Sequence, residues 1–240
     1  MRKRLPLILI TLIALAQAAL AGAMPLNTLS LDFTRTLTEA NREPETTAGT
    51  LHYDAKTERV VVEVMHPLRQ IMIVAKNRLD IYYPKEKQAF RFIAKTPIPL
   101  PFIDAIRHAT QPEHGLTALG YTLQRHDVRE TTLYTYWHPP KEAKESLGTI
   151  ILGSKEDRLV SVEVKNRKGQ LIATSHYSEH TRIGLTDIPM NVTATTYNLD
   201  AGTEQHEQIH YSNPHLNSDT PDPMLTFTIP ASIEVKEIQW

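Results

Sequence analysis

Apolar and polar residues alternate with a period of two along most of this chain of 240 residues. Leu29, Leu31 and Phe33, for example, alternate with Ser30 and Asp32. This pattern is typical of strands with one buried and one solvated face. It predicts strands over residues 29–37, 51–53, 60–64, 71–74, 78–83, 89–93, 121–125, 132–138, 149–152, 159–165, 171–177, 190–198 and 204–211. A chain built this way is expected to be mainly β.

One segment departs from the alternation. Residues 96–101 carry three prolines, and residues 102–106 then place apolar side chains at helical spacing. Because proline suits the first turn of a helix, this arrangement predicts a short helix between two sets of strands. No Gly/Ser-rich linker interrupts the chain, so we expect one large antiparallel sheet with a single helical insertion.

The N-terminus has the pattern of a secretory leader. Arg2, Lys3 and Arg4 precede an almost wholly apolar run over residues 5–21, and Ala21-Gly22-Ala23 offers small residues for cleavage. The run is shorter than a membrane span needs. We therefore expect residues 1–23 to be a signal peptide cleaved after Ala23, and residues 24–240 to form the exported, periplasmic domain.

The composition excludes several classes of protein. The chain has 26 basic and 27 acidic residues, a balance that argues against a nucleic-acid-binding protein. It has no cysteine, which excludes thiol chemistry, disulfides and the cysteine that a bacterial lipid anchor requires. The domain must be held together by its core alone, and we expect it to be a monomer that needs no cofactor.

The order of several short motifs resembles a known family. These motifs are Gly49-x-Leu51, Pro67-x-x-Gln70-Ile71, Leu79-x-Ile81-Tyr82-Tyr83-Pro84, Gln88-Ala89, Pro101-Phe102 and Phe227-x-Ile229-Pro230. In order and spacing they are similar to the LolA-like outer-membrane lipoprotein-sorting proteins, which are periplasmic lipoprotein carriers. The resemblance covers most of residues 24–240.

The resemblance implies a fold, a function and partners. The fold would be a half-open barrel of about eleven strands over short helices that act as a lid. The function would be to shield the acyl chains of lipoproteins, or of related lipids, between an inner-membrane donor and an outer-membrane acceptor. One feature of the family is missing, because its Arg-Pro pair after the Gly-x-Leu strand is replaced here by Asp54-Ala55-Lys56.

Two groups of apolar residues fit this implied function. The cavity is predicted to be lined by Val60, Val62, Val64, Ile81, Tyr83, Phe90 and Phe92. The lid is predicted to consist of Ile98, Leu100, Phe102, Ile103 and Ile106. The pattern by itself favours an ordinary filled core over a cavity, and only the resemblance favours the cavity.

One motif indicates an enzyme instead. His206-Glu207-Gln208-Ile209-His210 matches the H-E-x-x-H signature of zinc peptidases. That chemistry requires a helix, on which the two histidines lie about 6 Å apart. Here the segment follows a turn at Asp200-Ala201-Gly202 and a strongly β-prone run, and on a strand the histidines would lie roughly 13 Å apart. We therefore expect no catalytic and no metal-binding residues, although a zinc peptidase and a lipid-sensing module of the same fold remain alternatives.

The leader gives the first testable prediction. After expression with its leader, the exported chain is expected to begin at Met24, because Ala21 and Ala23 place small residues at the two positions that signal peptidase reads. Intact-mass measurement of the periplasmic protein checks this. Recovery of a chain that still begins at Met1, bound to membranes, would contradict the prediction.

Overall fold

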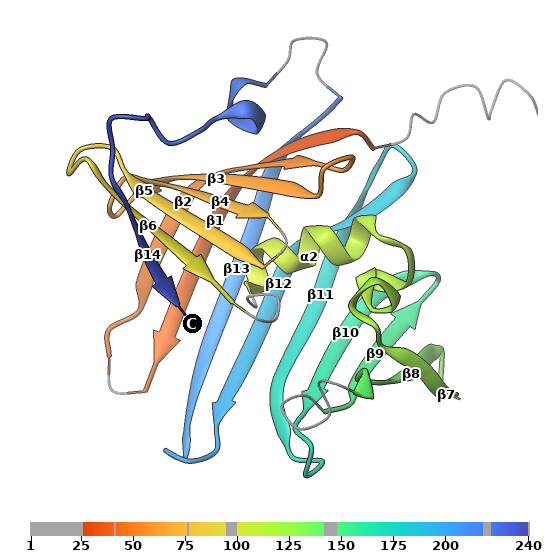
Figure 1. The fold of residues 1–240 in the computed structure, drawn as a ribbon. Helices are drawn as coiled ribbons and strands as arrows, with labels where there is room; N and C mark the ends of the chain where they lie inside the picture. Colours follow the sequence, from red (N-terminus) through yellow and green to blue (C-terminus); the bar gives the residue numbers. More distant parts are fainter. Residues whose placement is uncertain are drawn as a thin grey trace, which may run out of the picture.

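The computed structural model describes residues 26–40, 42–75, 77–94, 100–141, 148–217 and 222–239. Within them, fourteen strands form one strongly curved sheet, and helix α2 (Pro101–Thr110) lies against its concave face (Figure 1). The strands are β1 (Thr28–Glu39), β2 (Glu45–Asp54), β3 (Arg59–His66), β4 (Gln70–Ala75), β5 (Arg78–Tyr83), β6 (Gln88–Ile93), β7 (Thr122–Arg129), β8 (Thr132–His138), β9 (Ile150–Lys155), β10 (Arg158–Lys165), β11 (Leu171–Ile183), β12 (Thr186–Asn198), β13 (Thr203–Leu216) and β14 (Val235–Gln239). Short 3₁₀ turns are η1 (Pro112–Gly115), η2 (Thr117–Leu119) and η4 (Pro223–Thr226).

The sheet consists of two meanders joined in the middle. Its order is β14-β6-β5-β4-β3-β2-β1-β13-β12-β11-β10-β9-β8-β7. The pairing of β1 with β13 joins the two halves and brings together residues such as Phe33 and Tyr211 that are far apart in the chain. Strands β14 and β7 form the two edges and do not pair with each other, so the sheet is open.

The concave face holds the main core. One apolar cluster runs from Leu29, Leu31 and Phe33 on β1 across the sheet to Val162 on β10 and Tyr177 on β11. Helix α2 begins with a proline in its first turn, as the sequence predicts, and contributes buried side chains to the same cluster. The helix is therefore the cover of the concave face.

A second, smaller cluster lies on the opposite face of β3, β4, β5 and β6. It contains Val61, Ile71, Ile73, Tyr82 and Ala89. The C-terminal segment covers it, with Phe227 stacked on Tyr82 at 6.2 Å and β14 added to β6 in parallel. Because both faces of these strands are covered, three consecutive residues of β3 are fully buried, namely Val60, Val61 and Val62.

The mainly β fold, the open antiparallel sheet and the short helix are confirmed. The number of strands differs from the expectation, since the sheet has fourteen rather than about eleven. The alternation did not reveal β14, because Val235–Gln239 is short and exists as a strand only through its pairing with β6. The leader, residues 1–23, lies outside the described residues. None of the helices in the part of the chain described is long and apolar enough to span a membrane.

Gly49 provides a test of this packing. A Cβ atom at this position would lie 2.0 Å from the backbone oxygen of Glu63 on β3, beside a register shift between β2 and β3. We expect Gly49→Ala to destabilise the fold by about 1–3 kcal/mol, because backbone rather than a flexible side chain must move. Denaturant unfolding measures this, with Thr46→Ala on the exposed part of β2 as a control. Equal stability of the two variants would contradict the expected contact.

Candidate functional site

The predicted cavity residues share one face of the sheet. Val60, Val62 and Val64 on β3 are fully buried and belong to the concave cluster. The register pairs Ile81 with Phe90, and Ile81 and Phe92 pack against that same cluster. Ile81, Tyr83, Phe90 and Phe92 are all half-buried. The concave face is therefore apolar from its filled centre towards the β6 end, where its side chains remain partly accessible.

The predicted lid residues are on or beside α2. Phe102 is 6% exposed, and Ile103 and Ile106 are fully buried in the concave cluster. Leu100, which precedes the helix, is half-buried against the cluster. Ile98 lies outside the described residues. The structure places these side chains between helix and sheet, and their role as a movable lid stays a prediction.

Polar contacts hold the helix at both ends. The Tyr211 hydroxyl on β13 donates a hydrogen bond to the carbonyl oxygen of Phe102 in the first turn. At the other end, the Thr110 hydroxyl lies 3.0 Å from the Tyr53 hydroxyl on β2. Burial raises the pKa of Tyr211 well above its ordinary value, so its phenol stays protonated and can donate. Because the Tyr211 hydroxyl bonds the backbone of Phe102, this hydrogen bond does not require the Phe102 side chain.

An ion pair lies beneath the helix. The Arg35 Nε atom on β1 is 2.7 Å from a Glu207 carboxylate oxygen on β13, and Glu207 is 6% exposed. The Arg35 guanidinium also lies 5.6 Å from the centre of the Phe102 ring. An arginine of β1 therefore contacts the first turn of α2.

The H-E-x-x-H segment is part of strand β13, as the alternation predicts. Its histidines are exposed, whereas Glu207 is buried. His206 lies 3.1 Å from the Thr195 hydroxyl, and His210 lies 2.7 Å from the Asn191 side chain. A strand separates the two histidines by roughly 13 Å, too far to share a metal ion. No group of three or more metal-ligating side chains lies together within the described ranges.

Asp104 is a charged group in the same interface. Its carboxylate accepts a hydrogen bond of 2.8 Å from the backbone N–H of Leu100 and lies 3.6 Å from an Arg107 nitrogen. Burial raises the pKa of Asp104 from 3.8 to about 6, with the Leu100 N–H and Arg107 opposing the rise and Glu207 adding to it. This carboxyl group therefore titrates close to neutral pH.

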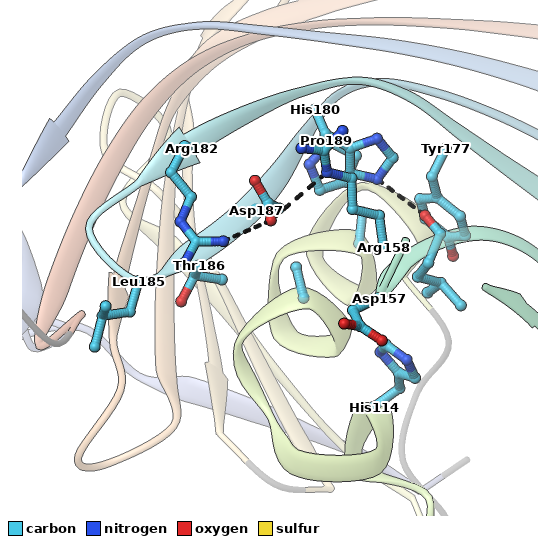
Figure 2. Close-up of a pocket in the computed structure, with 13 residues that line it drawn as sticks. His114, Asp157, Arg158, Tyr177, His180, Arg182, Leu185, Thr186, Asp187 and Pro189 are labelled. Atoms are coloured by element: carbon cyan, nitrogen blue, oxygen red, sulfur yellow. Dashed lines mark hydrogen bonds and ion pairs between the residues drawn. The ribbon is translucent and has the colours of Figure 1, made fainter. Parts of the chain in front are cut away.

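A pocket of about 230 Å³ opens at one side of α2 (Figure 2). Arg182 donates to Asp187 at 2.8 Å, and Arg158 lies 3.6 Å from the same carboxylate oxygen. Asp157 and His114 also line this pocket (Figure 2). The residues that line it are Ala105, Ala109, His114, Asp157, Arg158, Leu159, Tyr177, His180, Arg182, Leu185, Thr186, Asp187 and Pro189.

The lining combines an apolar wall with a rim of nearly balanced charge. Two arginines face two aspartates, and exposed Glu156 lies 3.9 Å from Arg158. The wall next to the helix consists of Ala105 and Ala109, whose small side chains leave the space open. Such a pocket has no strong preference for an ion of either sign.

Sequence reasoning did not identify Arg35, Glu207 or Asp104 as parts of this site. For Arg35 and Glu207, the alternation along the strands does indicate an inward position. Arg35 continues the inward positions of Leu29, Leu31 and Phe33, and Glu207 shares its side of β13 with Ile209 and Tyr211. A charged residue at an inward position needs a partner. The alternation alone could not tell which partner it has.

The ion pair gives a further prediction. Arg35→Met is expected to cost about 3 kcal/mol of unfolding free energy, because it leaves the Glu207 carboxylate buried without its cation. The double variant Arg35→Met/Glu207→Gln removes both charges and should recover most of that loss. Denaturant unfolding of the two variants and the wild type measures the difference. A double variant no more stable than Arg35→Met would show that the pair does not balance a buried charge.

Comparison with known proteins identifies the fold. No family model matches this sequence, and no curated protein matches it. Among solved structures, a LolA superfamily protein from Nitrosomonas europaea aligns with a TM-score of 0.59 at 16% identity, covering 88% of this chain and 97% of that one. A domain assigned as an outer membrane lipoprotein-sorting protein from Vibrio parahaemolyticus aligns at 0.56 and 12% identity, with 89% and 95% covered. A DUF1329 family protein from Desulfovibrio piger aligns at 0.59 and 12% identity, with 89% and 94% covered. This chain therefore has the LolA-like fold.

Proposed function

We propose that this protein is a periplasmic carrier that shields the acyl chains of lipoproteins, or of related lipids, between the concave face of its sheet and α2. The observation that supports this most is the nature of the interface under the helix. Phe102, Ile103 and Ile106 are buried against an apolar sheet. Among the described residues, the polar contacts between helix and sheet are the bond from Tyr211 to the Phe102 carbonyl and the contact of Thr110 with Tyr53. A cover with those properties can be displaced by an apolar ligand.

The energetics favour such an exchange. When the helix leaves, its apolar side chains and those of the sheet would be exposed to water, at a cost that an acyl chain in the same place offsets. Each methylene group transferred from water into an apolar site contributes about 0.8 kcal/mol. The half-buried side chains of Ile81, Tyr83, Phe90 and Phe92 extend the apolar surface beyond the helix. A ligand could use this surface before the helix has moved completely.

The pocket beside α2 is the natural starting point for the ligand. Its apolar wall is continuous with the core through Leu159 and Tyr177, which belong to the concave cluster. Because the charges at its rim nearly balance, the pocket suits a ligand whose head group has no net charge. No catalytic group is needed for this function.

The cellular setting rests on the leader and on the neighbours of the fold. Residues 1–23 have the pattern of a signal peptide, and the Vibrio parahaemolyticus neighbour carries the description of outer membrane lipoprotein sorting. We infer that the carrier receives its cargo from an inner-membrane donor and delivers it to an outer-membrane acceptor, acting as a monomer. Expression to the periplasm, extraction of the purified protein and mass spectrometry of the extract test whether an acyl-containing compound is bound.

Two substitutions on α2 test the lid directly. If Phe102 were static core, Phe102→Ala would cost about 3–5 kcal/mol. If the helix exchanges its contacts for cargo, we expect a smaller loss of stability and at least a fivefold weaker affinity for a fluorescent acyl probe. Ile106→Ser should weaken binding in the same way. Denaturant unfolding and fluorescence titration give the two quantities.

Val128→Ser is the control, because Val128 on β7 is 65% exposed and far along the sheet from α2. It should change neither stability nor affinity. A full core-type loss of stability for Phe102→Ala with unchanged acyl binding would mean that α2 is a fixed part of the core.

A further inference from the structure

Asp104 is the one charged side chain in the first turn of α2, and its place in the interface is unusual for a carboxylate. Its neighbours in the helix, Phe102, Ile103, Ala105 and Ile106, are all buried, and 21% of its own side-chain surface is exposed. An ionised carboxylate is costly in such a place unless it is fully paired. Arg107 is 3.6 Å away, beyond hydrogen-bond distance, so the pairing is incomplete.

Among the described residues, Arg107 is the one cation that acts on the pKa of Asp104. On β13, Glu207 adds negative charge, although Arg35 from β1 pairs with it. Tyr177 on β11 and Tyr211 on β13 are neutral phenols whose pKa values burial raises, and the Asp104 charge adds to both shifts. Tyr53 on β2 is also a neutral phenol and contacts the far end of the helix.

The charged groups of the pocket line it together with Ala105 and Ala109 of α2. Arg158 and Arg182 pair with Asp187, and His114 and Asp157 line the same pocket. The carboxylate of Asp187 on β12 is therefore paired with the two arginines. The environment of Asp104 is thus better suited to a neutral carboxyl group than to an ionised one.

We propose that protonation of Asp104 controls the docking of α2 on the sheet, so that the helix is held closed in mildly acidic medium and is released more readily at neutral pH. This inference rests on the proposed function, because it makes the lid of the carrier sensitive to pH. The Leu100 N–H can donate to either form of the carboxyl group, so the helix keeps its N-terminal bond when the proton binds.

The direction of the effect follows from the two states of the helix. In the docked state the pKa of Asp104 is about 6, whereas a solvated aspartate has the ordinary value of 3.8. The docked state therefore binds the proton more tightly, and its extra stability is complete below about pH 4 and lost as the pH rises through 6. With these two values, docking should be about tenfold more favourable at pH 5 than at pH 7.5.

Hydrogen exchange of the backbone amides of α2 measures docking without any ligand. After correction for the intrinsic exchange rates, the protection of these amides in the wild type should be about tenfold greater at pH 5 than at pH 7.5. In Asp104→Asn the protection should be the same at both values, since the amide keeps the hydrogen bond to Leu100 but cannot titrate. Asp104→Ser is a second uncharged variant in case the first does not fold.

The pocket histidines, His114 and His180, are the matched control, because they are ionisable side chains that line the pocket beside α2. The double variant His114→Gln/His180→Gln should keep the tenfold difference in protection. Protection of α2 that is independent of pH in the wild type would overturn the proposal. So would a dependence that survives in both Asp104 variants or disappears in the histidine variant.

A binding measurement separates this proposal from the proposed function. A neutral fluorescent monoacylglycerol should bind the wild type about tenfold more weakly at pH 5 than at pH 7.5, and Asp104→Asn equally at both. If the probe does not bind at either pH, the carrier function fails while hydrogen exchange still decides the role of Asp104. The probe could also bind equally well at pH 5 and pH 7.5 while the protection of α2 changes tenfold. Docking of α2 would then depend on pH without controlling access of the ligand, and the proposed release of the ligand-binding face at neutral pH would be wrong.

Discussion

The apolar concave face of the sheet must be kept from water, and most of the structure follows from the way α2 achieves this. The sheet is open because β14 and β7 do not pair, so its curvature alone does not enclose the concave side chains. Phe102, Ile103 and Ile106 cover the centre of the face, and burial of each such side chain is worth about 1.5–3 kcal/mol. The helix is short, which limits how much of the face it can protect and leaves Ile81, Tyr83, Phe90 and Phe92 half-buried.

The polar groups under the helix determine its position rather than its affinity for the sheet. Apolar contacts are non-directional, so they would allow α2 to slide along the concave face. The bond from Tyr211 to the Phe102 carbonyl and the contact of Thr110 with Tyr53 fix the two ends. The Arg35–Glu207 pair lies between strands β1 and β13, where the two halves of the sheet meet, and touches the Phe102 ring. The packing of α2 on the sheet and the joining of the two meanders therefore share the same side chains.

The convex face shows the opposite solution to the same physical problem. The second cluster on β3, β4, β5 and β6 is covered by a segment with several firm attachments. Arg59 donates to the Phe227 carbonyl, His52 lies 2.5 Å from Asp222, and β14 adds backbone hydrogen bonds to β6. These bonds attach the C-terminal segment to the sheet at several separate points. The two sides of this region are therefore covered differently, the convex side by the C-terminal segment and the concave side by α2.

The sequence by itself determined the strands and the helix, because alternation, turn residues and proline positions act over a few neighbouring residues. The predicted strands over residues 60–64, 78–83 and 132–138 all lie within strands of the sheet, and the proline-led segment became α2. Glu207 was correctly assigned to a strand for the same local reason.

Only the tertiary structure decided which distant residues meet. Arg35 and Glu207 are separated by 172 positions, and β14 exists because the chain end returns to β6. The pKa of Asp104 likewise depends on its burial and on Glu207 from β13. Desolvation and pairing energies depend on the surroundings of a group, and those surroundings form only when the whole sheet has curved around its helix.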